Sequence, residues 1–222
     1  MSKDVMIEII PAILTSDPQE LKDLLIRCED ASVGRVQIDI VDGVFAKNKT
    51  IDPSVILNLN LDLNLSLDFH LMVKEPINWI ERCVSVGADR IIGQVEMMSN
   101  QVEFVGKVTE IGTKVGLAID LDTPVSNLDS VILTNLDVVL VMSVSAGFGG
   151  QKFDEKALDK IKKLDEIRAR DDTPFRICDD GGIVLEWIDD SRREGADEVS
   201  IGRRLFKGDL KKNVERFQKA AY

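Results

Sequence analysis

Polar side chains lie inside four short runs of strand-forming residues, at positions 37–43, 68–72, 142–144 and 178–182. A carboxylate or an imidazole in an apolar run is costly to bury unless it is paired or bound to a metal ion, so each one requires an explanation. Gln37 and Asp39 are two residues apart and therefore point to the same side of a strand, as Asp68 and His70 do. If these strands are neighbours, an imidazole, a carboxamide and several carboxylates converge at one site.

Two of these carboxylates, Asp39 and Asp180, could serve as base and acid in a proton transfer at carbon. Removing a proton from a carbon next to a carbonyl requires a base on one face, an acid on the other and positive charge near the developing oxyanion. A metal ion bound by Asp39, His70 and Asp180 would supply that charge. Structural roles are the alternatives. Asp39 could cap a loop, Asp180 could open a turn, and His70, the only histidine of the chain, could be a satisfied core residue.

Glycines in two later segments predict an anion site. Gly147, Gly149 and Gly150 would let backbone amides approach an oxyanion. Gly202 could do the same at the N-terminus of a helix. Arg203 would begin this helix, where a cation opposes the helix dipole unless an anion is bound there. We therefore predict a phosphate site, with a mobile turn as the alternative.

Alternating apolar and amphipathic runs predict the elements that position these residues. The predicted strands are 5–14, 35–40, 65–72, 90–94, 114–119, 138–143, 175–178 and 198–201. Asp17 and Pro18 supply an N-cap and a first-turn proline for a helix that extends to residue 31. The remaining predicted helices are a short one from residue 53, then 76–86, 102–111, a weak one at 126–133, then 155–170, 184–194 and 210–221, with a turn at 87–89.

Eight strand-then-helix units with short connections favour one domain, residues 1–222, folded as a (β/α)8 (TIM) barrel. The run at 138–141 is continuously apolar, as in parallel strands covered on both faces. A doubly wound open sheet is the alternative, but the glycine motif for nucleotides does not follow the first strand. Chemistry in such barrels lies at the C-terminal ends of the strands. Polar or glycine residues occur at or near six of these ends: Asp39, His70, Gln94, Ser143, Asp180 and Gly202.

The composition narrows the class of partners. A formal net charge of -11 over 222 residues and a pI near 4.7 argue against nucleic acid and anionic membrane surfaces. The cysteines, Cys28, Cys83 and Cys178, have no metal-finger spacing, which is typical of buried residues in a reducing compartment. There is no signal-peptide pattern and no apolar run of membrane-spanning length, so we expect a cytoplasmic protein. The sequence is compatible with a monomer or with a homo-oligomer.

From Ile9 to Phe206 the chain resembles the ribulose-phosphate 3-epimerases and related sugar-phosphate epimerases. Segments 11–14, 39–48, 68–73, 142–153 and 180–182 carry the resemblance, and Ser-Ala-Gly-Phe-Gly-Gly-Gln at 145–151 is its most specific part. The resemblance implies a barrel that exchanges the proton on carbon 3 of a ketose phosphate, such as D-ribulose 5-phosphate, through Asp39 and Asp180. It also implies a divalent metal ion (zinc, manganese, iron, cobalt or magnesium) that holds the enediolate through Asp39, His70, Asp180 and the position of Gln37.

The resemblance also implies which residues bind the sugar phosphate. Met72 and Met142 could form an apolar wall around the reacting carbon, with core packing as the alternative. The remaining predicted substrate-binding and phosphate-binding residues are Gly147, Phe148, Gly149, Gly150, Gly181, Gly182, Gly202 and Arg203.

The chain departs from the family pattern within this site. Gln37 stands where the pattern has histidine, and its amide oxygen can coordinate a hard cation but is a poor zinc ligand. The other departures are Ala12 for serine, Val41 for methionine, Lys47 for proline, Gln94 for histidine and Arg203 for serine. Three functions follow: an epimerase, a barrel that binds a sugar phosphate without turning it over, and a decarboxylase or aldol-type enzyme. The third ranks last because Val41 occupies the position where it would need a lysine.

Overall fold

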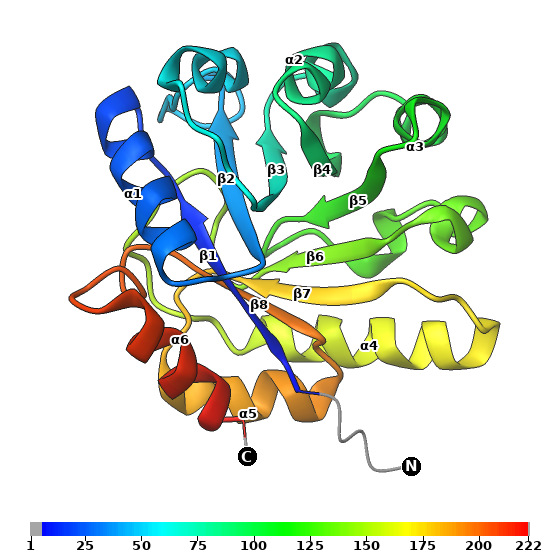
Figure 1. The fold of residues 1–222 in the computed structure, drawn as a ribbon. Helices are drawn as coiled ribbons and strands as arrows, with labels where there is room; N and C mark the ends of the chain where they lie inside the picture. Colours follow the sequence, from blue (N-terminus) through cyan, green and yellow to red (C-terminus); the bar gives the residue numbers. More distant parts are fainter. Residues whose placement is uncertain (1–5, 222) are drawn as a thin grey trace.

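Eight parallel strands close into a barrel in chain order in the computed structural model, which describes residues 6–221. Figure 1 shows the helices arranged around the outside of the strands. The predicted (β/α)8 barrel is therefore confirmed. Val5, the first residue of the predicted strand 5–14, lies outside the described residues. The strands are β1 (Glu8–Ile13), β2 (Arg35–Val41), β3 (Ser66–Met72), β4 (Ala88–Gln94), β5 (Lys114–Ile119), β6 (Val138–Met142), β7 (Arg176–Asp180) and β8 (Glu198–Ile201).

The structure has fewer α-helices than the sequence predicted. The helix after Asp17 is confirmed, and the Asp17 side chain accepts a hydrogen bond from the Gln19 amide at 2.9 Å. The α-helices are α1 (Pro18–Asp30), α2 (Ile80–Ser85), α3 (Gln101–Ile111), α4 (Lys156–Asp171), α5 (Leu185–Glu194) and α6 (Leu210–Lys219). The 3-10 segments are η1 (Pro53–Leu59), η2 (Pro76–Trp79), η3 (Val95–Met97), η4 (Val125–Asn127) and η5 (Ser130–Asn135).

Three predicted elements differ from the structure. The helix predicted at 126–133 is broken into η4 and η5, because the Asp129 side chain accepts from the Val131 amide and begins a new turn there. The helix predicted at 76–86 begins as the 3-10 segment η2 and becomes α-helical at Ile80. Only Gly87 of the predicted turn 87–89 is a turn residue, with φ at 81°, because Ala88 already pairs with Leu67 in the barrel.

Strand register places the polar residues of β2 beside those of β3. The pairing runs from Arg35 with Ser66 to Val41 with Met72, so that Asp39 lies next to His70. Neighbouring residues in parallel strands point to the same side of the sheet, and both side chains therefore enter the barrel at the same level. On the opposite side of the barrel, β7 ends at Asp180, which pairs with Met142 of β6 and with Ser200 of β8.

Apolar residues fill the space between the strands and the helices, and a smaller apolar cluster fills the barrel interior. Ile92, Val138, Leu140 and Cys178 belong to this inner cluster and are fully buried. The barrel is therefore a packed core beneath its mouth, as expected for eight strands. None of the helices within residues 6–221 has the length and apolar composition needed to cross a bilayer.

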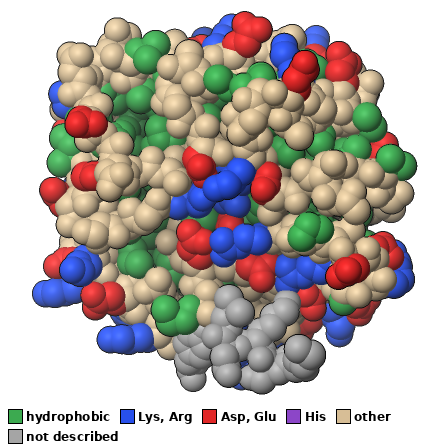
Figure 2. All heavy atoms as spheres, turned by 45° about the vertical axis from the view of Figure 1, so that its right-hand side comes forward, with side chains coloured by type: hydrophobic (Ala, Val, Ile, Leu, Met, Phe, Trp, Pro, Cys, Tyr) green, Lys and Arg blue, Asp and Glu red, His purple; other side chains and the backbone are tan. Residues whose placement is uncertain are grey.

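Buried charges close the barrel at the end where the strands begin. The Arg90 guanidinium donates to Asp68 Oδ2 at 2.9 Å and to Glu198 Oε1 at 3.0 Å, and all three side chains are buried. Arg35 also pairs with Asp68. A buried charge is stable only when it is paired and hydrogen-bonded, and each carboxylate here faces a guanidinium. On the surface, the face in Figure 2 shows acidic and basic side chains intermixed.

Candidate active site

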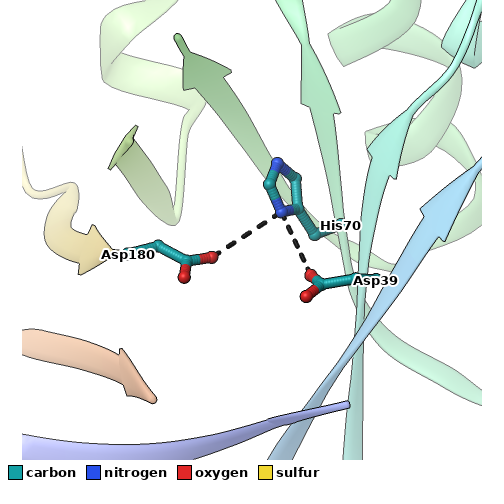
Figure 3. Close-up of side chains that lie close together, drawn as sticks. All are labelled: Asp39, His70 and Asp180. Atoms are coloured by element: carbon teal, nitrogen blue, oxygen red, sulfur yellow. Dashed lines mark hydrogen bonds and ion pairs between the residues drawn. The ribbon is translucent and has the colours of Figure 1, made fainter. Parts of the chain in front are cut away.

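Asp39, His70 and Asp180 converge at the mouth of the barrel (Figure 3). His70 Nδ1 lies 3.2 Å from Asp39 Oδ1 and 3.7 Å from Asp180 Oδ2. One ligand atom from each residue lies within 4.8 Å of the others. The imidazole is fully buried, whereas the Asp39 and Asp180 side chains are 13% and 10% exposed. The convergence that the sequence predicted is present, and a small molecule entering the mouth can reach both carboxylates.

Gln94 orients the imidazole from its other side. His70 Nε2 lies 2.8 Å from Gln94 Oε1, and a carbonyl oxygen only accepts, so His70 Nε2 carries a hydrogen and donates it. His70 Nδ1 is then the nitrogen that faces the carboxylates. An imidazole whose second nitrogen donates to an amide oxygen has the arrangement usually found for a metal-ligating histidine.

Gln37 connects the two carboxylates. Its amide Nε2 donates to Asp39 Oδ1 at 2.8 Å and to Asp180 Oδ2 at 2.7 Å. The side chain is 1% exposed, and its Oε1 has no hydrogen-bond partner among the described residues. The amide therefore supplies the only direct bridge between the two carboxylates among the hydrogen bonds of residues 6–221, and it leaves a buried oxygen unsatisfied.

These donors fit a divalent cation. Two carboxylate oxygens and an imidazole nitrogen form a ligand set accepted by zinc, manganese and iron. A half-turn of the Gln37 amide exchanges its oxygen and nitrogen, which would bring the unpartnered Oε1 to face Asp39 and Asp180 as a fourth donor atom. The observation that supports the fit is this buried, unsatisfied oxygen beside three potential ligands.

Burial and neighbouring charges shift the pKa values of this group. Burial raises the pKa of Asp180 to about 7, and the charge of Asp39 adds to this increase. Burial alone would lower the pKa of His70, but its hydrogen bond to Asp39 and the charges of Asp39 and Asp180 raise it above the ordinary value. At neutral pH, one of two neighbouring carboxylates can therefore hold a proton while the other accepts one.

A cavity of about 420 Å³ opens above the carboxylates. Met72 and Met142 line it and are also buried in the inner apolar cluster, so the cavity wall and the core packing that the sequence left as alternatives are both present. They place polarizable apolar surface next to Asp39 and Asp180. Phe148, from the loop after β6, also lines the cavity and is 47% exposed. The cavity is large enough for a small phosphorylated sugar.

Glycines and cations from the segments after β6, β7 and β8 also line the cavity. The glycines are Gly147, Gly149, Gly150, Gly181, Gly182 and Gly202. Gly182 has φ at 64°, and a Cβ atom there would lie 2.4 Å from the Phe153 nitrogen, so the close packing of this loop requires glycine. Arg203 and Lys207 also line the cavity, and within residues 6–221 neither side chain forms an ion pair. Arg204 Nη1 donates to the Ile183 carbonyl at 2.5 Å and holds the adjacent loop.

The predicted helix N-terminus at Gly202 is wrong. Residues 202–209 form turns, and α6 begins at Leu210, where the Asp209 side chain accepts from the Lys212 amide. The helix-dipole argument for an anion at Arg203 therefore fails. Arg203 could still bind an anion directly, because its side chain lines the cavity.

Comparison with known proteins identifies the family of this chain. A model of the ribulose-phosphate 3 epimerase family matches residues 8–206. A curated ribulose-phosphate 3-epimerase of Treponema pallidum (strain Nichols) is 32% identical over 201 residues, which cover 90% of this chain and 92% of that protein. One of Escherichia coli (strain K12) is 34% identical over 212 residues, which cover 93% and 92%. The chain belongs to the ribulose-phosphate 3-epimerase family.

Solved structures with the same fold include more distant enzymes. A 3-hexulose-6-phosphate synthase superimposes with a TM-score of 0.68 at 12% identity and covers 97% of this chain and 100% of that one. A 4-hydroxy-2-oxoglutarate aldolase has a TM-score of 0.65 at 14% identity and covers 96% and 94%. At these identities the likeness shows the barrel alone.

Within the ribulose-phosphate 3-epimerase family, this chain retains the Asp-His-Asp group that could hold a divalent metal ion. Asp179, next to Asp180, points away from the cavity as predicted. It is buried, accepts a hydrogen bond from Ser143 Oγ and accepts another from Ser191 Oγ of α5 at 2.5 Å. Asp179 thereby ties the end of β7 to the end of β6 and to α5.

Lys207 and Ser200 are among the cavity residues that were not predicted from the sequence. Lys207 reaches the cavity from the turn after β8, and the signal for it was only a third cation within five residues of Arg203. Ser200 lies in β8, is 1% exposed and has no hydrogen-bond partner for its Oγ. A single serine between Val199 and Ile201 is typical of a packed strand residue, so its place at the cavity is known only from the structure.

Proposed function

We propose that this chain interconverts ketose phosphates that differ in configuration at carbon 3, with D-ribulose 5-phosphate and D-xylulose 5-phosphate as the substrate pair. The observation that carries the proposal is the pair Asp39 and Asp180, which come from strands on different sides of the barrel and line the same cavity. An epimerase needs two proton-transfer groups on opposite faces of one carbon, and two carboxylates meet this need.

The reaction requires one proton to leave and another to arrive. One carboxylate takes the proton from carbon 3, and the electrons of that bond move onto the oxygen of carbon 2, which gives an enediolate. The other group, as a carboxylic acid, returns a proton to carbon 3 on the opposite face. The pKa of about 7 for Asp180 supports a group that is partly protonated at neutral pH and can act in either direction.

The surrounding side chains hold this arrangement. Gln37 donates to both carboxylates and keeps their oxygens directed toward each other. A divalent cation bound by Asp39, His70 and Asp180 would supply positive charge to the oxygens of carbons 2 and 3. Gln94 holds the His70 ring so that Nδ1 stays directed at the carboxylates.

The phosphate would lie at the glycine-lined end of the cavity. Gly181, Gly182 and Gly202 allow backbone amides to approach an anion, and Arg203 and Lys207 supply charge. Because the whole chain carries a net charge of -11, these cations would give an anionic substrate a local attraction that the rest of the molecule opposes.

We place this reaction in the cytoplasm. Cys28, Cys83 and Cys178 are free and buried, and structural disulfides are rare in reducing compartments. The buried thiols support this location without defining it.

Exchange of the carbon-bound hydrogen tests the proposal. The chain is incubated with D-ribulose 5-phosphate and manganese in deuterated water, and deuterium at carbon 3 is followed by NMR. Wild type should incorporate deuterium, whereas Asp39→Asn and Asp180→Asn should each abolish incorporation. Asp122→Asn, an exposed loop acid, is the control and should exchange like wild type.

A barrel that binds a sugar phosphate without turning it over is the second candidate. Gln37 and Gln94 favour it, because amides occupy two positions around the only histidine. Absence of deuterium incorporation with zinc, manganese, iron, cobalt and magnesium, together with calorimetric binding of ribulose 5-phosphate, would select this candidate over the epimerase.

A further inference from the structure

Ser200 has an unsatisfied hydroxyl group at the wall of the cavity. It is 1% exposed, its Oγ has no hydrogen-bond partner among the described residues, and it lines the same cavity as Asp39 and Asp180. A buried hydroxyl without a partner costs free energy, and native proteins rarely keep one without a reason. Two other buried polar atoms of the site, Gln37 Oε1 and Gln94 Nε2, also lack a partner, although the nitrogen of Gln37 and the oxygen of Gln94 are joined to the network of His70 and the two carboxylates.

The register of the barrel locates this hydroxyl along the cavity. Ser200 pairs with Asp180 of β7, so the two residues lie side by side at one level. Gly202, two residues further along the chain, lines the end of the cavity where the cations are. Two residues of a strand advance about 6.6 Å. Ser200 therefore lies at the level of Asp180, and Gly202 and Arg203 lie further along the chain toward the mouth of the barrel.

On the neighbouring strand, β1, no side chain competes for this hydroxyl. Ile10 pairs with Ser200, and Ala12 lines the cavity two residues further on. Both side chains are apolar. β1 therefore supplies no partner for this hydroxyl, whereas a molecule in the cavity can supply one.

We propose that Ser200 binds the hydroxyl group on carbon 4 of the substrate, next to the reacting carbon, and selects ketose phosphates that carry this group. The inference rests on the proposed function for the identity of the substrate. Carbon 4 is the position between carbon 3, which must lie at the two aspartates, and the phosphate, which must lie beyond it. A serine hydroxyl can both donate and accept, as the sugar hydroxyl does, so each can satisfy the other.

Removal of the hydroxyl tests this assignment in two ways. Ser200→Ala should leave the unfolding temperature unchanged or raised, because the deleted group has no partner in the protein. Ser191→Ala is the matched control: this buried serine donates to Asp179 and to the Trp187 carbonyl, and its variant should unfold at a lower temperature. A loss of thermal stability in Ser200→Ala as large as in Ser191→Ala would overturn the inference.

The second test compares kcat/KM of wild type and Ser200→Ala on ribulose 5-phosphate and on an analogue that lacks the hydroxyl group on carbon 4. For D-ribulose 5-phosphate, Ser200→Ala should lower kcat/KM about tenfold, a typical effect of one lost hydrogen bond. For the 4-deoxy analogue, wild type and Ser200→Ala should have equal kcat/KM. An equal loss for both substrates, or no loss for ribulose 5-phosphate, would overturn the assignment.

Binding separates this inference from the proposed function. If wild type shows no turnover, the epimerase proposal fails. Calorimetry then measures the affinity of wild type and of Ser200→Ala for ribulose 5-phosphate and for the 4-deoxy analogue. Weaker binding of ribulose 5-phosphate by Ser200→Ala, with equal binding of the 4-deoxy analogue, would still support the Ser200 contact. Failure of wild type to bind ribulose 5-phosphate at all would overturn both proposals.

Discussion

Gln37 Nε2 lies 2.7 Å from Asp180 Oδ2, although 143 residues separate them in the chain. Closure of the barrel brings β2 and β7 to the same cavity, and the Gln37 amide joins their two carboxylates. An amide in this place can donate hydrogen bonds to both carboxylates, or it can present its oxygen to a cation, but it cannot bind zinc as strongly as an imidazole does. The choice of metal ion therefore depends on this one side chain.

Replacement of Gln37 by histidine should tighten zinc binding. An imidazole would complete a set of two nitrogens and two carboxylates, so we expect at least a tenfold gain in zinc affinity and a smaller gain for manganese. Calorimetric titration of metal-free protein with each ion measures both. Gln37→Leu should lose the amide oxygen and bind manganese more weakly than wild type. Equal zinc affinity in Gln37→His and wild type would show that residue 37 does not reach the ion.

Gln94 should control the affinity of His70 for a metal ion. Its Oε1 accepts from His70 Nε2, and loss of such a partner typically reduces metal affinity about 10–100-fold. We expect Gln94→Leu to bind manganese at least tenfold more weakly than wild type in the same titration. Gln101→Leu is the control, because the Gln101 side chain donates to the Asn127 carbonyl, outside the cavity. An unchanged affinity in Gln94→Leu would contradict a role for Gln94 in orienting the imidazole.

Local sequence patterns were sufficient for the strands but not for the contacts between them. The predicted bounds of β5 and β8 match the structure to the residue, and in β5 a run of buried residues follows Lys114, as expected for a strand covered on both faces. The bond between His70 and Gln94 depends on the register of two neighbouring strands and on side-chain rotation, which no local pattern contains. The helix N-terminus predicted at Gly202 was wrong because a glycine at the end of a strand does not distinguish a turn from the start of a helix, and here turns precede α6.

The position of Ser200 at the cavity is a second feature that no local sequence pattern could predict. In the sequence it is one serine between Val199 and Ile201, a pattern typical of a packed strand. Its orientation toward Asp180 follows from the pairing of β7 with β8. The presence of the Asp39, His70 and Asp180 group was predictable because charged residues inside apolar runs are rare, whereas a small neutral hydroxyl gives no such signal.

Arg203 should strengthen phosphate binding without affecting proton transfer. Its guanidinium lines the cavity and has no ion pair within residues 6–221. A charge-assisted hydrogen bond to phosphate contributes about 1.5–3 kcal/mol, so Arg203→Ala should raise KM about tenfold or more and leave kcat within a factor of two. Lys212→Ala, an exposed cation on α6, is the control. A fall in kcat with unchanged KM would contradict this role.

Glu198 should make the fold sensitive to acid. Burial alone would raise the pKa of Glu198, but its hydrogen bonds to Arg90 and the charge of that guanidinium lower it below the ordinary value of 4.5. A carboxyl whose pKa is lower in the folded state stabilises the fold above its unfolded pKa, and this contribution is lost as the pH falls through the folded pKa. The free energy of unfolding, from urea titrations at neutral pH and at roughly pH 4.5 and pH 3.5, should therefore decrease toward acid.

Glu198→Gln isolates this contribution. The variant leaves part of the buried Arg90 charge uncompensated, so we expect it to be about 3–5 kcal/mol less stable than wild type at neutral pH. Because the introduced amide does not titrate, the difference between wild type and variant should shrink in acid, below the ordinary glutamate pKa of 4.5, while carboxylates that do not share Arg90 with Glu198 contribute equally to both proteins. Glu155→Gln, at an exposed position before α4, should match wild type throughout. A difference that stays constant between neutral and acid pH would show that the Arg90 pair does not lower the pKa of Glu198.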